Sequence, residues 1–176
     1  MLLIADPFLK DDHFKRSVIF LCSHSKDGSV GFALNKKFTH SLTQLVSGIG
    51  ENNIPVFVGG PVELDSIHFI HKYPQLIKCC EKISETIYWG GDFDQVKELV
   101  SNNLLDLDKI KFFIGYSGWG KGQLNEELKE KSWLKSKSND NIIFKTSPES
   151  VWKESILQMG PDYKELVNYP LDPQLN

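Results

Sequence analysis

The chain has 176 residues, of which 40% are apolar, 24% charged and 11% aromatic, and its 20 basic and 23 acidic residues leave a formal net charge of -3. This composition is typical of one soluble globular domain and excludes an intrinsically disordered chain, which combines low hydrophobicity with high net charge. The acidic balance also disfavours broad binding to nucleic acid, which needs a face rich in Lys and Arg. We therefore expect a single domain over residues 1–176.

The cysteines indicate a reducing compartment. Cys22, Cys79 and Cys80 are odd in number and two of them are adjacent, a pattern that secreted disulfide frameworks rarely use. The apolar run at the N-terminus is too short for a signal peptide, and Asp6 interrupts it. No stretch approaches the roughly 20 apolar residues that span a bilayer. We expect a cytoplasmic protein without membrane contact.

Strands are predicted through the first two thirds of the chain. Residues 17–24 and 30–35 are apolar runs separated by turn residues, which predicts a β-hairpin. The sequence Gly59-Gly60-Pro61 favours a turn over a ligand contact, because proline directly after glycine is turn chemistry. Further strands are expected at residues 55–58, 66–73, 86–89, 110–116 and 141–145.

Three helices are predicted in the second half. Asp92 is a favourable N-cap, and apolar residues at helical spacing follow it. A second helix is expected over residues 123–133, where Glu127 and Lys131 are spaced to pair. Ser147 precedes a third, with proline at its first position and an acid in its first turn. Early strands and late helices favour an α+β domain over strict βαβ alternation.

Several motifs together resemble the YqgE/AlgH family of bacterial proteins. They are LIADPFLKDDHFKRSVIFL at 3–21, HSKDGSVGFALN at 24–35, VGGPV at 58–62, SIHFIH ending at His71, and GYSGWGKGQLNEEL at 115–128 followed by SWL. The resemblance implies an α+β fold in which a bifurcated mixed sheet curls into a partial barrel with helices packed outside. It implies no reaction and no cofactor. The transcriptional-regulator label of some members does not by itself mean contact with DNA.

The glycine-rich segment of the last motif is the first candidate site. It lies between a predicted buried strand and a helix start, where free backbone N–H groups favour an anion. Gly122 stands where a phosphate-binding loop has the Ser or Thr that holds Mg²⁺, so no NTP site is predicted. A tight turn with Trp119 capping the core is the commoner origin of such a pattern. The candidate ligand-binding residues are Gly115, Gly118, Trp119, Gly120, Lys121 and Gly122.

Polar residues near strand ends could line a cleft with this segment; they are His24, Asn35 and His71. His68 and His71 are three residues apart and point to opposite faces of a strand, so they do not form a metal chelate. Cys22 and His24 share a strand face, which permits a thiol–imidazole pair. A buried Cys beside a hydrogen-bonding His is the more ordinary expectation. No metal site and no catalytic residue set is predicted.

Two classes of function stay open. We favour a non-enzymatic binding or regulatory module with a cleft near the glycine-rich segment for a small anionic ligand or a protein partner. The alternative is a hydrolase-type enzyme that uses His24 or His71 as acid/base. Convergence of these histidines with Asn35 beside the segment would favour a shared site. Specific binding to DNA is not expected, because the chain offers no basic recognition helix.

Overall fold

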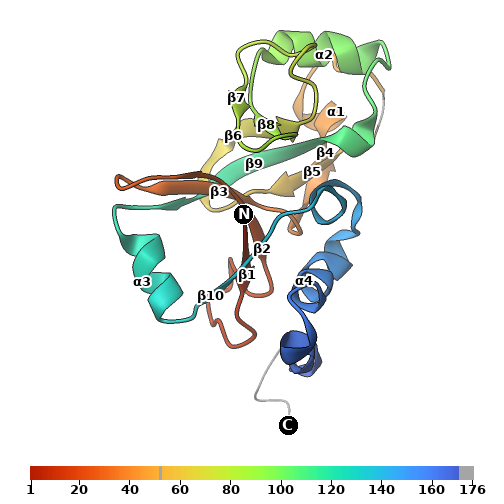
Figure 1. Cartoon of the computed structure of the whole chain (residues 1–176). Helices are drawn as coiled ribbons and strands as arrows, with labels where there is room; N and C mark the ends of the chain where they lie inside the picture. The colour runs from red at the N-terminus through yellow and green to blue at the C-terminus, as the bar shows by residue number, and fades with distance from the viewer. Residues whose placement is uncertain (52, 171–176) are drawn as a thin grey trace.

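The computed structural model describes residues 1–51 and 53–170. Within them the chain forms one curved sheet with helices around it (Figure 1). The strands are β1 (Leu2–Ala5), β2 (Val18–His24), β3 (Ser29–Ala33), β4 (Lys37–Ser41), β5 (Pro55–Val58), β6 (Val62–His71), β7 (Glu81–Lys82), β8 (Tyr88–Trp89), β9 (Ile110–Trp119) and β10 (Trp133–Ser136). The α-helices are α1 (Leu42–Leu45), α2 (Phe93–Ser101), α3 (Gln123–Lys129) and α4 (Pro148–Leu157). Short 3-10 helices at Leu107–Lys109 and Pro161–Asn168 and a π-helix at Asn141–Lys145 complete the secondary structure of this part.

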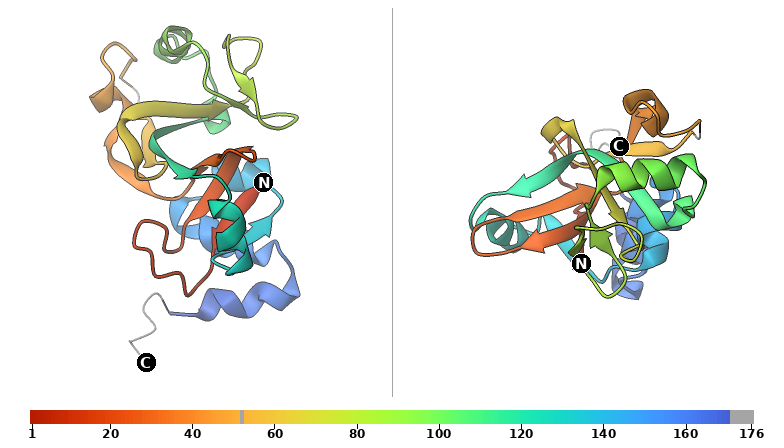
Figure 2. Two further views of the ribbon diagram at one scale, coloured as in Figure 1. Left: turned by 90° about the vertical axis from the view of Figure 1, so that its left-hand side faces the viewer. Right: turned by 90° about the horizontal axis from the view of Figure 1, so that it is seen from above.

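The sheet divides at β9. The strand order is β10-β1-β2-β3-β9-β6-β8-β7, and β5, which also pairs with β4, branches from β9. Residues 112–114 of β9 pair in parallel with β5 and antiparallel with β6, whereas residues 117–119 pair with β3. Figure 2 shows the resulting two parts from further sides, with α2 at one end and α4 toward the other. The expected bifurcated mixed sheet, curled into a partial barrel with helices outside, is confirmed.

Glycines allow the strands to cross closely at this fork. The Gly59 carbonyl accepts the N–H of Ala33 at 2.8 Å, and the Gly59 N–H donates to β9 at 2.8 Å. A Cβ on Gly60 would lie 2.3 Å from the carbonyl carbon and oxygen of Tyr116. A Cβ on Gly59 would lie 2.4 Å from the carbonyl oxygen of Gly115. The chain reverses here between β5 and β6, as the turn prediction requires, and the missing side chains make room for backbone.

Substitution at the fork should be severely destabilising. Gly60→Ala places a methyl group against backbone that no rotamer change can move, so we expect a loss of at least about 3 kcal/mol in the free energy of unfolding. Gly120→Ala is the matched control, because its Cβ would meet nothing closer than 3.8 Å. Urea unfolding followed by circular dichroism measures both. Equal stability of the two variants would contradict this account of the fork.

Apolar side chains gather in three clusters around the sheet. The first packs α4 and the π-helix against β1, β2 and β3, and includes Trp152. The second lies between α2 and the face of β5, β6 and β9 that carries Phe112. The third joins Leu124 of α3 to Trp119 and Trp133. No helix in the described ranges combines the length and apolarity needed to cross a membrane.

Most predicted elements are present with adjusted bounds. The hairpin is β2–β3, residues 55–58 are β5, and the predicted strands at 66–73, 86–89 and 110–116 correspond to β6, β8 and β9. Asp92 caps α2 by accepting the N–H groups of Asp94 and Gln95. The helix after Ser147 is α4, with Pro148 in its first turn.

Two predictions in the second half are wrong. Residues 141–145 are not a strand but a π-helix, because their apolar run is buried against the first cluster without a strand partner. The helix expected over 123–133 ends at Lys129, and Trp133 begins β10. Lys131 lies beyond the helix with a φ of 61°. The expected Glu127–Lys131 pair is therefore replaced by other contacts of Glu127.

Lys111 brings a charge into the core. Only 7% of its surface is exposed. Its Nζ donates to the Ile143 carbonyl in the π-helix at 3.2 Å and lies 4.0 Å from the centroid of the Phe57 ring. Burial disfavours the charged ammonium and lowers the pKa of Lys111 from 10.5 to about 7.

The buried lysine should make stability depend on pH. Lys111→Met is expected to raise the free energy of unfolding at pH 6 by roughly 1 to 4 kcal/mol, because it removes a buried charge. Between about pH 7 and pH 10 the unfolded chain keeps this proton and the folded chain releases it, so wild-type stability rises relative to the variant. Thermal unfolding at pH 6, 8 and 10 measures the difference. If the difference in stability between Lys111→Met and the wild type did not narrow with rising pH, the prediction would be contradicted.

Candidate functional site

The glycine-rich segment is mostly strand. Residues 115–119 form the last half of β9, and only residues 120–122 connect β9 to α3, a helix of 7 residues. The N–H of Gly120 is already donated to Gln123 Oε1 at 3.0 Å. Gly115 and Gly122 have positive φ, but Gly118 and Gly120 do not. The expected order of strand, connection and helix is present, but the connection is shorter than expected, and an anion contact at exposed Lys121 stays a prediction.

The Glu127 carboxylate of α3 links this segment to its neighbours. Glu127 Oε2 accepts the indole N–H of Trp119 at 2.8 Å and that of Trp133 at 2.7 Å, while its Oε1 accepts from Gln123 Nε2 at 2.9 Å. The two indoles meet edge to face at 6.0 Å, and Phe14 packs against both. Trp119 is 5% exposed and caps the core as expected. The motif thus encodes a packed cluster around one negative charge, which does not favour an anion nearby.

Removal of this carboxylate should be costly. Glu127→Leu leaves two buried indole N–H groups without an acceptor, so we expect a loss of about 2 to 4 kcal/mol in the free energy of unfolding. Glu126→Leu on the exposed side of the same helix loses only its contact with Lys129 and should change stability by less than about 1 kcal/mol. Chemical unfolding followed by tryptophan fluorescence compares them. Similar losses in both variants would refute the role of Glu127.

The two candidate histidines lie at opposite ends of β9: His24 is beside this segment, because its partner Ser29 pairs with Trp119, whereas His71 pairs with Ile110. His24 is exposed, and its Nδ1 lies 2.7 Å from Ser29 Oγ. His71 is fully buried; its Nδ1 accepts the N–H of Tyr73 at 3.0 Å, so its Nε2 donates to the Gly90 carbonyl at 3.0 Å. Burial lowers the pKa of His71, in keeping with this neutral form. Both nitrogens of His71 serve the fold, and the ring has no access to a substrate.

The other metal and thiol candidates are structural. His68 contacts Phe32, whereas His71 contacts Phe69 on the opposite side of β6, as their spacing predicts. The Cys22 thiol is directed to the Phe20 carbonyl at 3.7 Å and not to a histidine. Burial raises the pKa of Cys22, which disfavours a reactive thiolate. Among the residues that the structure describes, no cluster of three or more His, Cys, Asp or Glu could hold a metal ion.

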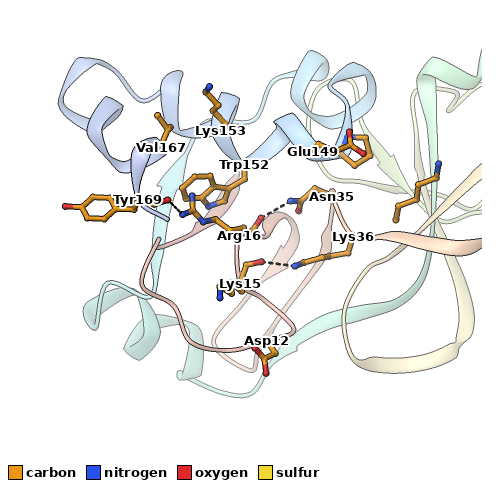
Figure 3. Close-up of a pocket in the computed structure, with 12 residues that line it drawn as sticks. Asp12, Lys15, Arg16, Asn35, Lys36, Glu149, Trp152, Lys153, Val167 and Tyr169 are labelled. Atoms are coloured by element: carbon orange, nitrogen blue, oxygen red, sulfur yellow. Dashed lines mark hydrogen bonds between the residues drawn. The ribbon is translucent and has the colours of Figure 1, made fainter. Parts of the chain in front are cut away.

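A separate pocket gathers positive charge (Figure 3). It lies between the β1–β2 loop, the segment after β3, the N-terminal turn of α4 and the C-terminal 3-10 helix, with a volume of about 720 Å³. Its lining includes five cationic residues and two carboxylates, in a chain whose net charge is negative. We call it the basic pocket, and its residues are Asp12, Lys15, Arg16, Asn35, Lys36, Lys37, Pro148, Glu149, Trp152, Lys153, Val167 and Tyr169.

Asn35 fixes the wall of the basic pocket. Its Oδ1 accepts the N–H of Val18 at 3.0 Å, and its Nδ2 donates to the Arg16 carbonyl at 2.8 Å. These bonds hold the end of the β1–β2 loop against the end of β3. Of the three polar residues that the sequence singled out, Asn35 lies in this pocket, where it positions backbone, while His24 and His71 lie outside its lining.

Arg16 is held in an unusual state. Its φ of 56° is left-handed, and its guanidinium lies 3.8 Å above the Trp152 ring. Its Nη2 donates to the carbonyls of Tyr169 and Pro170, and its Nε is buried without a partner. Burial lowers the pKa of Arg16. A non-glycine residue in this conformation is often part of a functional site, because the fold must compensate its strain.

Lys36 is likewise a partly buried cation that donates to a backbone carbonyl. Its Nζ donates to the Lys15 carbonyl at 2.7 Å, and burial lowers the pKa of Lys36. None of the ion pairs found in the described ranges involves Lys36 or Arg16. Two half-buried cations therefore rest on neutral carbonyls, which leaves them able to attract an anion.

A local signal for this pocket is present in the sequence. The basic pairs Lys15-Arg16 and Lys36-Lys37 stand directly before and after the predicted hairpin. Because the two open ends of a hairpin are neighbours, such pairs must come close together. The stacking of Arg16 on Trp152 spans far more of the chain and has no local signal.

Comparisons with known proteins identify the relatives of this chain. A family model described as AlgH-like matches residues 2–164. A UPF0301 protein from Cytophaga hutchinsonii is 42% identical over 99% of this chain and 97% of its own length. One from Parabacteroides distasonis is 41% identical, covering 99% and 89%.

Two solved structures share the fold. The AlgH protein from Pseudomonas aeruginosa is 22% identical with a TM-score of 0.77, covering 96% of this chain and 92% of its own. A protein from Corynebacterium diphtheriae is 16% identical with a TM-score of 0.79, covering 96% and 90%. At these identities the two structures establish the architecture and no activity.

Proposed function

The chain belongs to the AlgH-like family, and from this premise we propose that it is a non-enzymatic binding module that takes a small anionic ligand in the basic pocket. This proposal keeps the class of ligand expected from the sequence and moves its site from the glycine-rich segment. The observation that carries it is the pair of half-buried cations, Arg16 and Lys36, whose hydrogen bonds within the described residues go to neutral carbonyl oxygens.

An anion would correct the electrostatic deficit of these two groups. Each cation has lost part of its hydration, and a hydrogen bond to a neutral carbonyl restores less free energy than one to a negatively charged oxygen. Lys15, Lys37 and Lys153 line the same pocket and add further attraction. A pocket of about 720 Å³ is within the range of roughly 300 to 1,000 Å³ typical of small-molecule sites. Phosphate and carboxylate groups both suit this chemistry.

The hydrolase alternative rests on one contact, the 2.7 Å separation of His24 Nδ1 and Ser29 Oγ. A catalytic serine also needs donors for the oxyanion and a group that orients the base. In the described part of the chain, the other ring nitrogen of His24 has no hydrogen-bond partner. We therefore favour binding without catalysis.

A regulatory role of this module would be indirect. We place the protein in the cytoplasm, where the free thiols of Cys22, Cys79 and Cys80 are stable. Five of its 20 Lys and Arg residues line one concave pocket, and a compact ligand suits such a pocket better than a DNA duplex does.

The proposal predicts weak, metal-independent binding of anions in the basic pocket. Titration with inorganic phosphate, pyrophosphate and citrate, followed by NMR amide shifts, should move residues around Arg16 and Lys36. Lys36→Gln should weaken binding at least about tenfold, because it removes a charge-assisted contact that contributes about 1.5 to 3 kcal/mol. Fluorescence anisotropy with duplex DNA should show no sequence-specific binding at physiological salt.

Lys121→Gln is the matched control for this titration. It removes one exposed lysine from the glycine-rich segment and leaves the basic pocket unchanged. Affinity close to that of the wild type is expected. If Lys121→Gln abolished binding while Lys36→Gln preserved it, the site expected from the sequence would replace the one proposed here.

A further inference from the structure

Arg16 connects the basic pocket to a segment 153 residues away in the sequence. Its Nη2 donates to the Tyr169 carbonyl and, at 3.2 Å, to the Pro170 carbonyl (Figure 3 shows the first bond). The Tyr169 ring packs edge-on against Phe8 at a centroid distance of 4.8 Å. One side chain of the proposed ligand site thus also holds residues 168–170, which we call the C-terminal strap.

The strap is held by few contacts. In the 3-10 helix before it, Tyr163, Leu166 and Val167 pack against the first apolar cluster and anchor that helix. Tyr169 is 42% exposed and its partner Phe8 is 52% exposed, so their ring contact buries little area. The hydrogen bonds from Arg16 are therefore a large part of what keeps the strap in place.

We infer that the strap and an anionic ligand compete for Arg16, so that binding in the basic pocket releases the strap. This inference rests on the proposed function and adds a regulation of the same site. A phosphate or carboxylate oxygen is a stronger acceptor than a neutral carbonyl. A guanidinium grips such a group through two parallel N–H donors. Nη2 is engaged by the strap, and Nε is buried, so a two-point grip requires Nη2 to leave the carbonyls.

Competition has a reciprocal consequence. If the ligand weakens the docking of the strap, removal of the strap must strengthen the binding of the ligand by the same factor. Tyr169 and Pro170 are exposed residues, so their carbonyls can turn to water when Arg16 releases them. In the absence of ligand, the strap carbonyls thus accept the Arg16 hydrogen bonds that a ligand oxygen would otherwise accept.

Truncation tests this competition with pyrophosphate as the probe. A chain that ends in an amide after Asn168 lacks both carbonyls, places no new carboxylate beside Arg16, and should bind pyrophosphate about fivefold more tightly, the equivalent of one ordinary hydrogen bond. A chain that ends after residue 173 keeps both carbonyls and is the control, with affinity equal to that of the full chain. Phe8→Ala loosens the strap without truncation and should shift the affinity in the same direction.

Hydrogen exchange supplies a second measurement on the full chain. The N–H of Tyr169 donates to the Leu166 carbonyl, and its protection should fall when pyrophosphate is added. Equal pyrophosphate affinities of the full chain and the chain ending after Asn168, with unchanged exchange, would overturn the competition and leave the pocket proposal intact. If no form binds pyrophosphate, phosphate or citrate, the proposed function itself fails.

Discussion

The close crossing of backbones at Gly59, Gly60 and Gly115 is the constraint on which the rest of the structure depends. Here β9 leaves one set of partners and takes up another, and the crossing is possible because three side chains are reduced to hydrogen. The same crossing fixes the end of β3, since the Gly59 carbonyl accepts from Ala33. The wall of the basic pocket begins at Asn35, and β4 starts two residues later, at Lys37. The glycine motifs thus determine where the basic pocket can form.

The link from fork to pocket runs through a few backbone bonds. Val58, at the end of β5, donates its N–H to the Lys36 carbonyl at 2.7 Å. Asn35 then ties the same stretch to the backbone beside Arg16. Lys15, Arg16, Lys36 and Lys37 therefore lie at the two open ends of the β2–β3 hairpin, where β5 supports the backbone. Rigid support of this kind keeps charged groups together despite their mutual repulsion.

Local signals account for the part of the fold that was predictable. Apolar patterns, turn residues and helix caps, which act within a few residues, predict the hairpin, β5, α2 and α4. The π-helix was missed because a short apolar run with Ile142 and Ile143 fits a buried strand equally well by periodicity. β1 is four residues long and fully buried, and its strand partners lie elsewhere in the sequence. Such elements are defined by tertiary contacts.

The candidate site was predictable only in part, for a related reason. Asn35 was singled out and lies in the pocket, but its role is to bind backbone. Glycine allows both the close approach of a ligand and the crossing of two chain segments, and only the interatomic distances distinguish these two roles. The strained φ of Arg16 and its stack on Trp152 arise from contacts between distant segments. No pattern along one stretch of sequence reports them.

The arrangement at Arg16 is expensive for a purely structural role. A left-handed backbone costs roughly 1 to 2 kcal/mol for a residue with a side chain, and the buried Nε adds the loss of its hydration. The stack on Trp152 and the strap carbonyls return part of that free energy. A ligand that binds only the folded chain returns more, by an amount that grows with its concentration over its Kd. The anion that we propose for the basic pocket would therefore stabilise Arg16 beyond what the Trp152 ring and the strap carbonyls supply, because a charged oxygen is a stronger acceptor than a carbonyl.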